Sequence, residues 1–243
     1  RIERVHVNMD DLAQRHRGTI SGWEQKELRH GQSGGSRAAP RTYGRRANVF
    51  AVQSDLFDRP GLAGLTQAEA VVTGSEEQAL IASIDGVELS PFRFQRWLGK
   101  RLTACYGWRY DFDTATFGPT DPIPDWLLPL REKAARFARL KPDDLVQALL
   151  IRYDRGAGIG WHRDRPVFEH VVGISLGAPA TMRFRRRKFG GFDRVSALLA
   201  PRSIYHLAGE MRHEWEHSIA EMELTRWSIT FRSLAERERV AGL

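Results

Sequence analysis

The chain has 243 residues, of which 42% are hydrophobic, and a formal net charge of +7. This length suffices for one domain with a sizeable core, and no apolar run approaches the roughly 18 residues that a transmembrane helix needs. The single cysteine, Cys105, excludes an internal disulfide, and the amino terminus lacks the apolar core of a secretory signal. We therefore expect a cytoplasmic monomer with no membrane association.

The positive charge is concentrated near the amino terminus. Residues 1–48 carry ten Lys/Arg against five Asp/Glu, which leaves 27 against 25 for the remainder. The same segment is rich in Gly and Ser and shows no sustained periodicity. We predict a disordered basic flank over 1–48 and one domain over 49–243, and the total charge alone is weak evidence for nucleic-acid binding.

Two helices are predicted before residue 140. Ser75 and Gln78 have the spacing of a capping box, so a short helix should begin there and end near Gly86. A second helix is predicted over about 124–139, where apolar residues recur at helical spacing and Pro129 lies near the first turn.

After residue 144 the pattern changes to short apolar or alternating runs. These runs cover residues 145–153, 170–176, 180–186, 194–199, 203–208 and 225–233. Helices followed by a series of strands indicate an α+β, mainly β protein, with a β-sandwich or barrel and helices packed outside it.

A metal site is suggested by His162 and Asp164. On an extended strand their side chains share one face, so one ion can bind both, and His217 is the best candidate for a third ligand. Two imidazoles and one carboxylate suit an Fe(II) site with open positions, and also a hydrolytic zinc site. With eight His and 14 Asp, chance alone gives about 0.5 His-x-Asp pairs. Three further histidines are rival ligands: His170, His206 and His213.

The stretch Thr225–Leu234 supplies the discriminating feature. Alternation places Arg226, Ser228, Thr230 and Arg232 on one face of a strand, with Trp227, Ile229 and Phe231 on the other. Two arginines facing a core are costly unless an anion meets them, and a guanidinium binds a carboxylate in bidentate fashion. A buried dicarboxylate is one interpretation, and an edge strand with solvated arginines is the other.

The order of several motifs resembles the AlkB family of 2-oxoglutarate and Fe(II) dependent dioxygenases. The resemblance covers roughly residues 85–235 and rests on four segments: Leu150 to Gly156 continuing to Asp164, Val172 to Gly177, Gly209 to His217, and Arg226 to Arg232. It implies a double-stranded β-helix, which is a jelly-roll variant, with its core over about 144–235.

The resemblance also implies roles for individual residues. Fe(II) would be bound by His162, Asp164 and His217, and 2-oxoglutarate by Tyr153, Arg226, Arg232 and Ser228. Many relatives have asparagine where this chain has Ile151 and Ser228, so the details of the cosubstrate pocket differ.

The activity implied by the resemblance is oxidative demethylation of alkylated bases in DNA. The reaction consumes 2-oxoglutarate and O2, and it yields succinate, CO2 and formaldehyde. The same chemistry on RNA, particularly transfer RNA, is a close alternative, and a protein-directed dioxygenase is a third. A non-catalytic nucleic-acid binding module and a metallohydrolase are the alternatives from other classes.

Substrate contacts are expected in two regions. A nucleotide-recognition lid is implied over about 88–118, where aromatic and basic residues interleave; its candidates are Trp108, Tyr110, Tyr106 and Arg101. A basic hairpin with Arg185 and Arg186 is the candidate for phosphate contacts. The plainer interpretations are core aromatics and a solvated charged turn.

Overall fold

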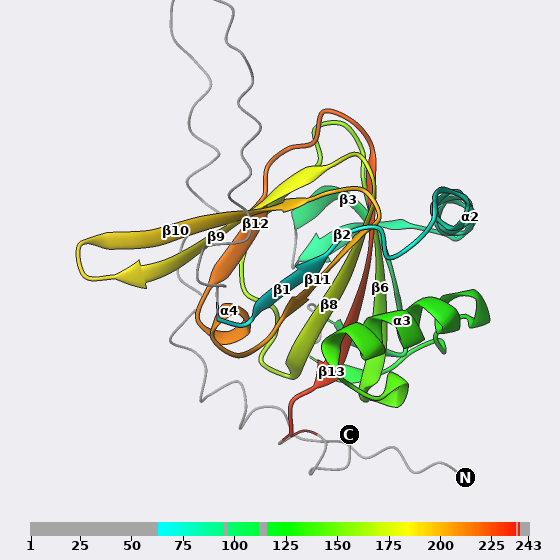
Figure 1. Ribbon diagram of the computed structural model, residues 1–243, viewed down its shortest axis with the longest axis horizontal. Coiled ribbons are helices and arrows are strands. Elements are labelled where there is room, and N and C mark those ends of the chain that lie inside the picture. Colours follow the sequence, from blue (N-terminus) through cyan, green and yellow to red (C-terminus); the bar gives the residue numbers. More distant parts are fainter. Residues whose placement is uncertain (1–62, 95–96, 112–115, 237, 239–243) are drawn as a thin grey trace, which may run out of the picture. The chain divides into compact units, whose positions relative to one another are not determined.

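Antiparallel strands in three sheets dominate the described part of the chain, which comprises residues 63–94, 97–111, 116–236 and 238 of a computed structural model (Figure 1). Contacts divide the chain into Arg1–Phe57 and Asp58–Leu243. The first unit lies outside the described residues, so the disordered flank over 1–48 stays a prediction.

The larger sheet has seven strands in a non-sequential order. That order is β1 (Leu65–Ala68), β11 (Ser203–Leu207), β8 (Phe168–Gly177), β13 (Arg226–Leu234), β6 (Leu145–Tyr153), β3 (Trp97–Tyr106) and β2 (Ser90–Phe94). Strand β13 lies at the centre, hydrogen-bonded to β8 on one side and to β6 on the other.

The smaller sheet has four strands and faces the larger one. Its order is β10 (Gly191–Leu199), β9 (Ala180–Lys188), β12 (Glu216–Ile219) and β7 (Ile159–His162). A separate two-stranded sheet joins β4 (Trp108–Asp111) and β5 (Thr116–Pro119). The two main sheets form the predicted double-stranded β-helix, or jelly roll, and β9 and β10 extend from it as a long hairpin (Figure 1).

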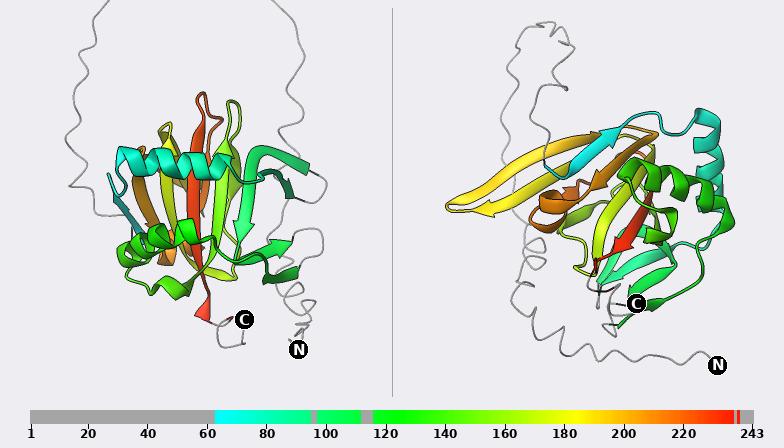
Figure 2. Two further views of the ribbon diagram at one scale, coloured as in Figure 1. Left: turned by 90° about the vertical axis from the view of Figure 1, so that its right-hand side faces the viewer. Right: turned by 60° about the horizontal axis from the view of Figure 1, so that its bottom comes forward.

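Two helices cover the outer face of the larger sheet, as expected. They are α2 (Gly74–Asp85) and α3 (Leu128–Ala138), and Figure 2 shows both crossing that face. The capping box at Ser75 and Gln78 was wrong: Thr73 caps α2, with its hydroxyl accepting from the Glu76 amide and the Glu76 carboxylate accepting from the Thr73 amide.

The second helix is preceded by the 3-10 turn η2 (Asp125–Leu127), and Pro129 lies in its first turn, where no N–H is needed. Two other short elements are η3 (Pro142–Asp144) and α4 (Gly209–His213). Among the residues described, no helix is long and apolar enough to cross a membrane.

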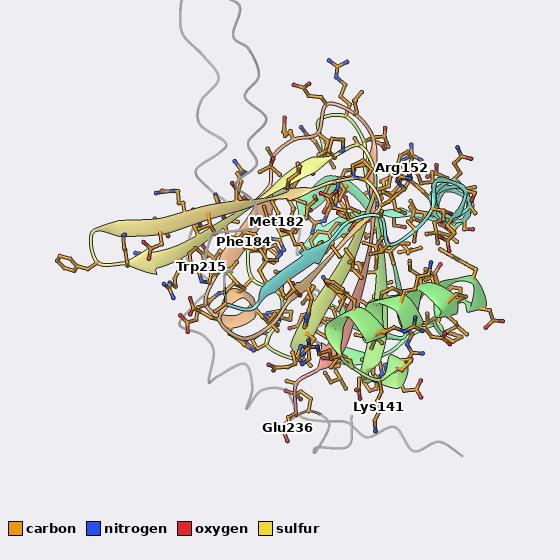
Figure 3. The ribbon with its side chains drawn as sticks, viewed as in Figure 1. Lys141, Arg152, Met182, Phe184, Trp215 and Glu236 are labelled. Carbon is orange, nitrogen blue, oxygen red and sulfur yellow. The ribbon has the colours of Figure 1, made fainter. Side chains whose placement is uncertain are left out.

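Two apolar clusters divide the core. One lies between the helices and the outer face of the larger sheet, and it takes up Trp227, Ile229 and Phe231 of β13. The other lies between the two sheets and contains Met182 and Phe184 of β9 together with Trp215, all three labelled in Figure 3. The opposite face of β13, with its arginines, is therefore turned into the interior of the jelly roll.

Candidate active site

Polar side chains line the inner face of the larger sheet around β13. Arg226 and Arg232 have exposed fractions of only 1% and 9%, and Ser228 and Thr230 between them are also buried. The alternation predicted for this strand is confirmed, and its arginines are not solvated edge residues. A buried polar strip of this kind requires partners.

Arg226 has few partners of its own. Its Nε donates to Ser175 Oγ at 3.2 Å, and its guanidinium lies 5.2 Å from the centre of the Tyr153 ring. Its Nη1 is buried and has no hydrogen-bond partner, and no carboxylate among the residues described pairs with it. This end of the inner face of β13 therefore presents a positive charge whose hydrogen-bonding capacity is only partly used.

Each guanidinium nitrogen of Arg232, in contrast, donates a hydrogen bond. Its Nε and Nη2 both donate to Asp164 Oδ1, at 3.1 and 2.9 Å, and its Nη1 donates to Gln147 Oε1 at 2.8 Å. The carboxylate is thereby held by one oxygen. Asp164 Oδ2 is buried and has no hydrogen-bond partner among the described residues.

The two candidate histidines lie on adjacent strands of the smaller sheet. His162 ends β7 and is paired in register with His217 of β12, with their ring centres 4.2 Å apart. His217 Nε2 lies 3.9 Å from Asp164 Oδ2. Strand β7 ends at His162, and Asp164 lies beyond it. The prediction that both side chains lie on one face of the same strand therefore does not hold for Asp164.

The protonation states suit metal ligands. Burial lowers the pKa of His162, and burial together with His162 lowers the pKa of His217 to about 3, so both rings are neutral near pH 7. Burial opposes ionisation of Asp164, but the nearby charge of Arg232 holds its pKa well below the usual range, so it stays a carboxylate. The 2.9 Å contact of His162 Nδ1 with the Gly160 carbonyl places the proton on Nδ1 and leaves Nε2 as a lone-pair donor.

These three side chains fit a divalent iron ion in type and charge. Two neutral imidazoles and one carboxylate with a free, buried oxygen are the donor set that an Fe(II) site with open positions uses. Ligand atoms about 2.1 Å from an ion lie roughly 3.0 to 4.2 Å apart, a range that includes the distance from His217 to Asp164. No described group of three His, Cys, Asp or Glu is already closed around one point, so binding requires a small adjustment of these side chains.

The lid candidates fall into two groups. Trp108 stacks on Phe117 with ring centres 5.2 Å apart, and the Arg165 guanidinium lies 3.9 Å from the centre of the Tyr110 ring, next to Asp164 in the chain. Arg101 is buried against Phe92, and its charge acts on His162. Tyr106 instead packs against the apolar cluster beneath the helices.

The basic hairpin is extensively ion-paired. Arg185 Nε lies 2.6 Å from Glu216 Oε2, and Arg186 pairs with Glu210 and with Glu214, the latter at 3.3 Å. Both guanidinium groups also lie against tryptophan rings, at Trp161 and Trp215 respectively. Phosphate contacts by these two arginines would therefore compete with existing carboxylate partners.

Three residues on the inner face of the larger sheet were not identified from the sequence. Gln147 and Ser175 are single polar residues within apolar runs, which is a signal that could have identified them. Tyr205 lies on β11 with a buried phenol, and nothing in its local sequence distinguishes it from a core aromatic.

Comparisons with known proteins agree with this geometry. A family model described as the 2OG-Fe(II) oxygenase superfamily matches residues 90–237. The solved structure of OsALKBH1 has a TM-score of 0.54 and 15% sequence identity, and the match covers 70% of this chain and 98% of that one. At this identity the structural likeness concerns the fold.

Two curated relatives are similar in sequence. The protein named tRNA (carboxymethyluridine(34)-5-O)-methyltransferase ALKBH8 from Mus musculus is 29% identical over 165 residues, which cover 64% of this chain and 24% of that protein. The Arabidopsis thaliana protein named Alkylated DNA repair protein ALKBH8 homolog is 28% identical over 182 residues, covering 64% of this chain and 50% of that protein. The chain thus spans at most half the length of either relative.

Proposed function

We propose that this chain, which belongs to the 2OG-Fe(II) oxygenase superfamily, oxidises alkyl groups on nucleic-acid bases. The AlkB resemblance is confirmed by the matches, and the chain carries a 2-oxoglutarate-dependent dioxygenase domain. Its cofactors are Fe(II), 2-oxoglutarate and O2. The observation that supports a cosubstrate site in the jelly roll best is the buried Arg226 guanidinium without a carboxylate partner.

The proposed ligand set is His162, Asp164 and His217 for the iron. For 2-oxoglutarate, Arg226 binds the carboxylate remote from the iron, assisted by Tyr153 and Ser228. Arg232 lies beside the proposed iron ligands, where its hydrogen bonds to Asp164 orient that carboxylate, and it neighbours the end of 2-oxoglutarate that would chelate the metal.

When bound together, iron, 2-oxoglutarate and O2 supply the oxidant that hydroxylates the methyl carbon. The side chains of the protein would orient the ligands of the metal and exclude water. Arg232 prevents rotation of the Asp164 carboxylate, Gly160 selects the His162 tautomer, and the apolar cluster between the sheets keeps bulk water from the reacting atoms. Loss of formaldehyde from the hydroxylated N-methyl group then needs no further catalytic residue.

For the substrate we propose alkylated bases in DNA, with transfer RNA as the second candidate. A relative named for DNA repair favours the first, and a relative named for transfer RNA favours the second. Formaldehyde release should be compared on methylated single-stranded DNA, duplex DNA and transfer RNA. Release from transfer RNA alone would replace the DNA proposal, and release from none would favour a binding module.

The site assignment is tested with Asp164→Ala. Under anaerobic conditions the wild-type protein with Fe(II) and 2-oxoglutarate should develop a visible charge-transfer band, and the variant should not. Asp143→Ala is a matched control, because the Asp143 side chain is 98% exposed and only meets Arg131 at the surface. A band that survives in Asp164→Ala would contradict the ligand set.

We also propose that the β9–β10 hairpin contacts the nucleic-acid backbone. The hairpin carries several cations, and Phe189 at its tip is fully exposed. Replacing Arg185 and Arg186 by alanine should weaken DNA binding and lower the slope of log affinity against log salt by about 1 to 2. Lys141→Ala provides a control on the opposite side of the domain (Figure 3). An unchanged slope would mean that Arg185 and Arg186 make no phosphate contacts, and would contradict this proposal.

A further inference from the structure

The phenol ring of Tyr205, a residue of β11, lies over the neighbouring strand β8. Tyr205 on β11 is in register with Gly173 on β8. A Cβ atom added at Gly173 would lie 2.2 Å from Tyr205 Cζ and 2.3 Å from its Oη. The far end of the ring therefore occupies the space above Gly173, and the side chain reaches from β11 over β8 toward β13.

This direction brings the hydroxyl group toward the buried arginines of β13. Tyr205 is only 6% exposed, and of the surrounding charges that of Arg226 acts on it most strongly, ahead of Asp164 and Arg232; Tyr153 also acts on it. Burial raises the pKa of Tyr205 to about 12, so the hydroxyl keeps its proton at neutral pH. It is then a hydrogen-bond donor.

Arg226 Nη1 is buried without a hydrogen-bond partner in the part of the chain that is described, and leaving such a donor buried is costly unless a ligand completes it. No hydrogen bond contributes to the shifted pKa of the Tyr205 hydroxyl, so its proton is available for a ligand. A carboxylate accepts about four hydrogen bonds, so one guanidinium and one hydroxyl can bind it together. Ile151, beside Ser228 on the neighbouring strand β6, is aliphatic and offers no donor there.

We propose that Tyr205 is a positioning residue for the cosubstrate: its hydroxyl donates a hydrogen bond to the 2-oxoglutarate carboxylate that Arg226 binds. Gly173 makes room for the phenol ring of Tyr205, since any larger residue at this position would displace the ring. The inference rests on the proposed binding of 2-oxoglutarate to Arg226 on the inner face of β13. It adds a donor from β11, a strand to which no cosubstrate contact was assigned.

The test compares two ligands in wild-type protein and in Tyr205→Phe. Binding of 2-oxoglutarate and of 2-oxobutanoate, which lacks the remote carboxylate, is measured anaerobically with Fe(II) from the charge-transfer band and by ligand-induced thermal stabilisation. Loss of one hydrogen bond to a charged group should weaken 2-oxoglutarate binding about tenfold. Binding of 2-oxobutanoate should change less than about twofold, because its contacts lie at the iron end.

Two further variants separate positioning from packing. Gly173→Ala retains the hydroxyl but displaces the ring, so it should reproduce the selective loss of 2-oxoglutarate binding. Ser203→Ala is the control, because Ser203 lies on β11 with Tyr205 but its hydroxyl donates to the Ala200 carbonyl. Binding of both ligands should be unchanged in this variant.

Each contrary result overturns the inference in a recognisable way. Equal weakening of both ligands in Tyr205→Phe would indicate a structural role, and unchanged binding would exclude a contact. Full 2-oxoglutarate affinity in Gly173→Ala would contradict the role of the glycine. If the wild-type protein binds 2-oxobutanoate and 2-oxoglutarate equally, or neither, the placement of the cosubstrate itself fails.

Discussion

Replacing Arg226 by methionine should stabilise the protein without ligand and abolish its affinity for 2-oxoglutarate. The Arg226 side chain is buried, and among the described residues its guanidinium donates only to Ser175 and no carboxylate offsets its charge. Apolar replacement of buried ionic groups is often neutral or stabilising by about 1 to 4 kcal/mol. For a domain of this size, each kcal/mol corresponds to about 2 to 4 °C in melting temperature.

Ligand binding should respond in the opposite direction. Loss of one member of a buried charge pair costs about 2 to 5 kcal/mol, which corresponds to an affinity about 30-fold to 5,000-fold lower. The assay is thermal denaturation with and without 2-oxoglutarate in the metal-loaded protein. The wild-type melting temperature should rise with ligand concentration, and that of Arg226→Met should start higher and stay constant.

The matched control is Arg152→Met. Arg152 lies on the other face of the sheet toward α2 (Figure 3) and pairs with Asp154 at 2.9 Å and Asp85 at 3.3 Å. As a partly exposed ion pair it should contribute at most about 1 kcal/mol, and its loss should not alter ligand binding. An Arg226→Met protein that melts lower than wild type and retains 2-oxoglutarate affinity would refute the reasoning.

Three further predictions concern other parts of the domain. Asp164→Ala should lower the free energy of unfolding by about 3 to 5 kcal/mol in denaturant titrations, because Arg232 loses its carboxylate partner in a buried site; a change below 1 kcal/mol would contradict this. Burial lowers the pKa of His206 to about 4 in the folded state, so unfolding takes up a proton as the pH falls from about 6.5 toward 4. Wild-type stability should decline over that range by about 1 kcal/mol more than that of His206→Gln, after allowing for partial exposure; parallel pH profiles would count against it. Gly107 has φ of +81°, and a Cβ there would lie 2.0 Å from the Val146 carbonyl oxygen, so Gly107→Ala should destabilise by at least about 2 kcal/mol, measured in the same titration; a melting temperature within 2 °C of wild type would show that the turn adjusts freely.

Much of the fold could be predicted because its strands bury one face each. The run 145–153 agrees with β6, and the other five predicted runs agree with observed strands to within a few residues. The five strands before residue 120, β1 to β5, were not predicted as strands, and β7 was predicted only as an extended segment at His162. Strand β12 was also missed, since it has only four residues and includes a histidine of the proposed metal site. Such short strands are held by their neighbours rather than by a periodic pattern of their own.

The site was predictable where it depended on alternation along one strand. The inward direction of Arg226 and Arg232 follows from the period of two on β13. The contacts of Arg232 with Gln147 and of Arg186 with Glu210 depend on which distant strands and helices are neighbours. That information resides in the sheet order and register, so local sequence could not supply it.

The central position of β13 has a consequence for local stability. Its backbone amides are hydrogen-bonded to β8 and β6 on both sides, whereas β10 forms an edge of the smaller sheet. Amide hydrogens of Ser228 and Thr230 should therefore exchange with solvent only through global unfolding, and those of the hairpin through frequent local opening. The domain therefore combines a proposed cosubstrate site on the strand that opens last with a proposed nucleic-acid contact on a hairpin that opens readily.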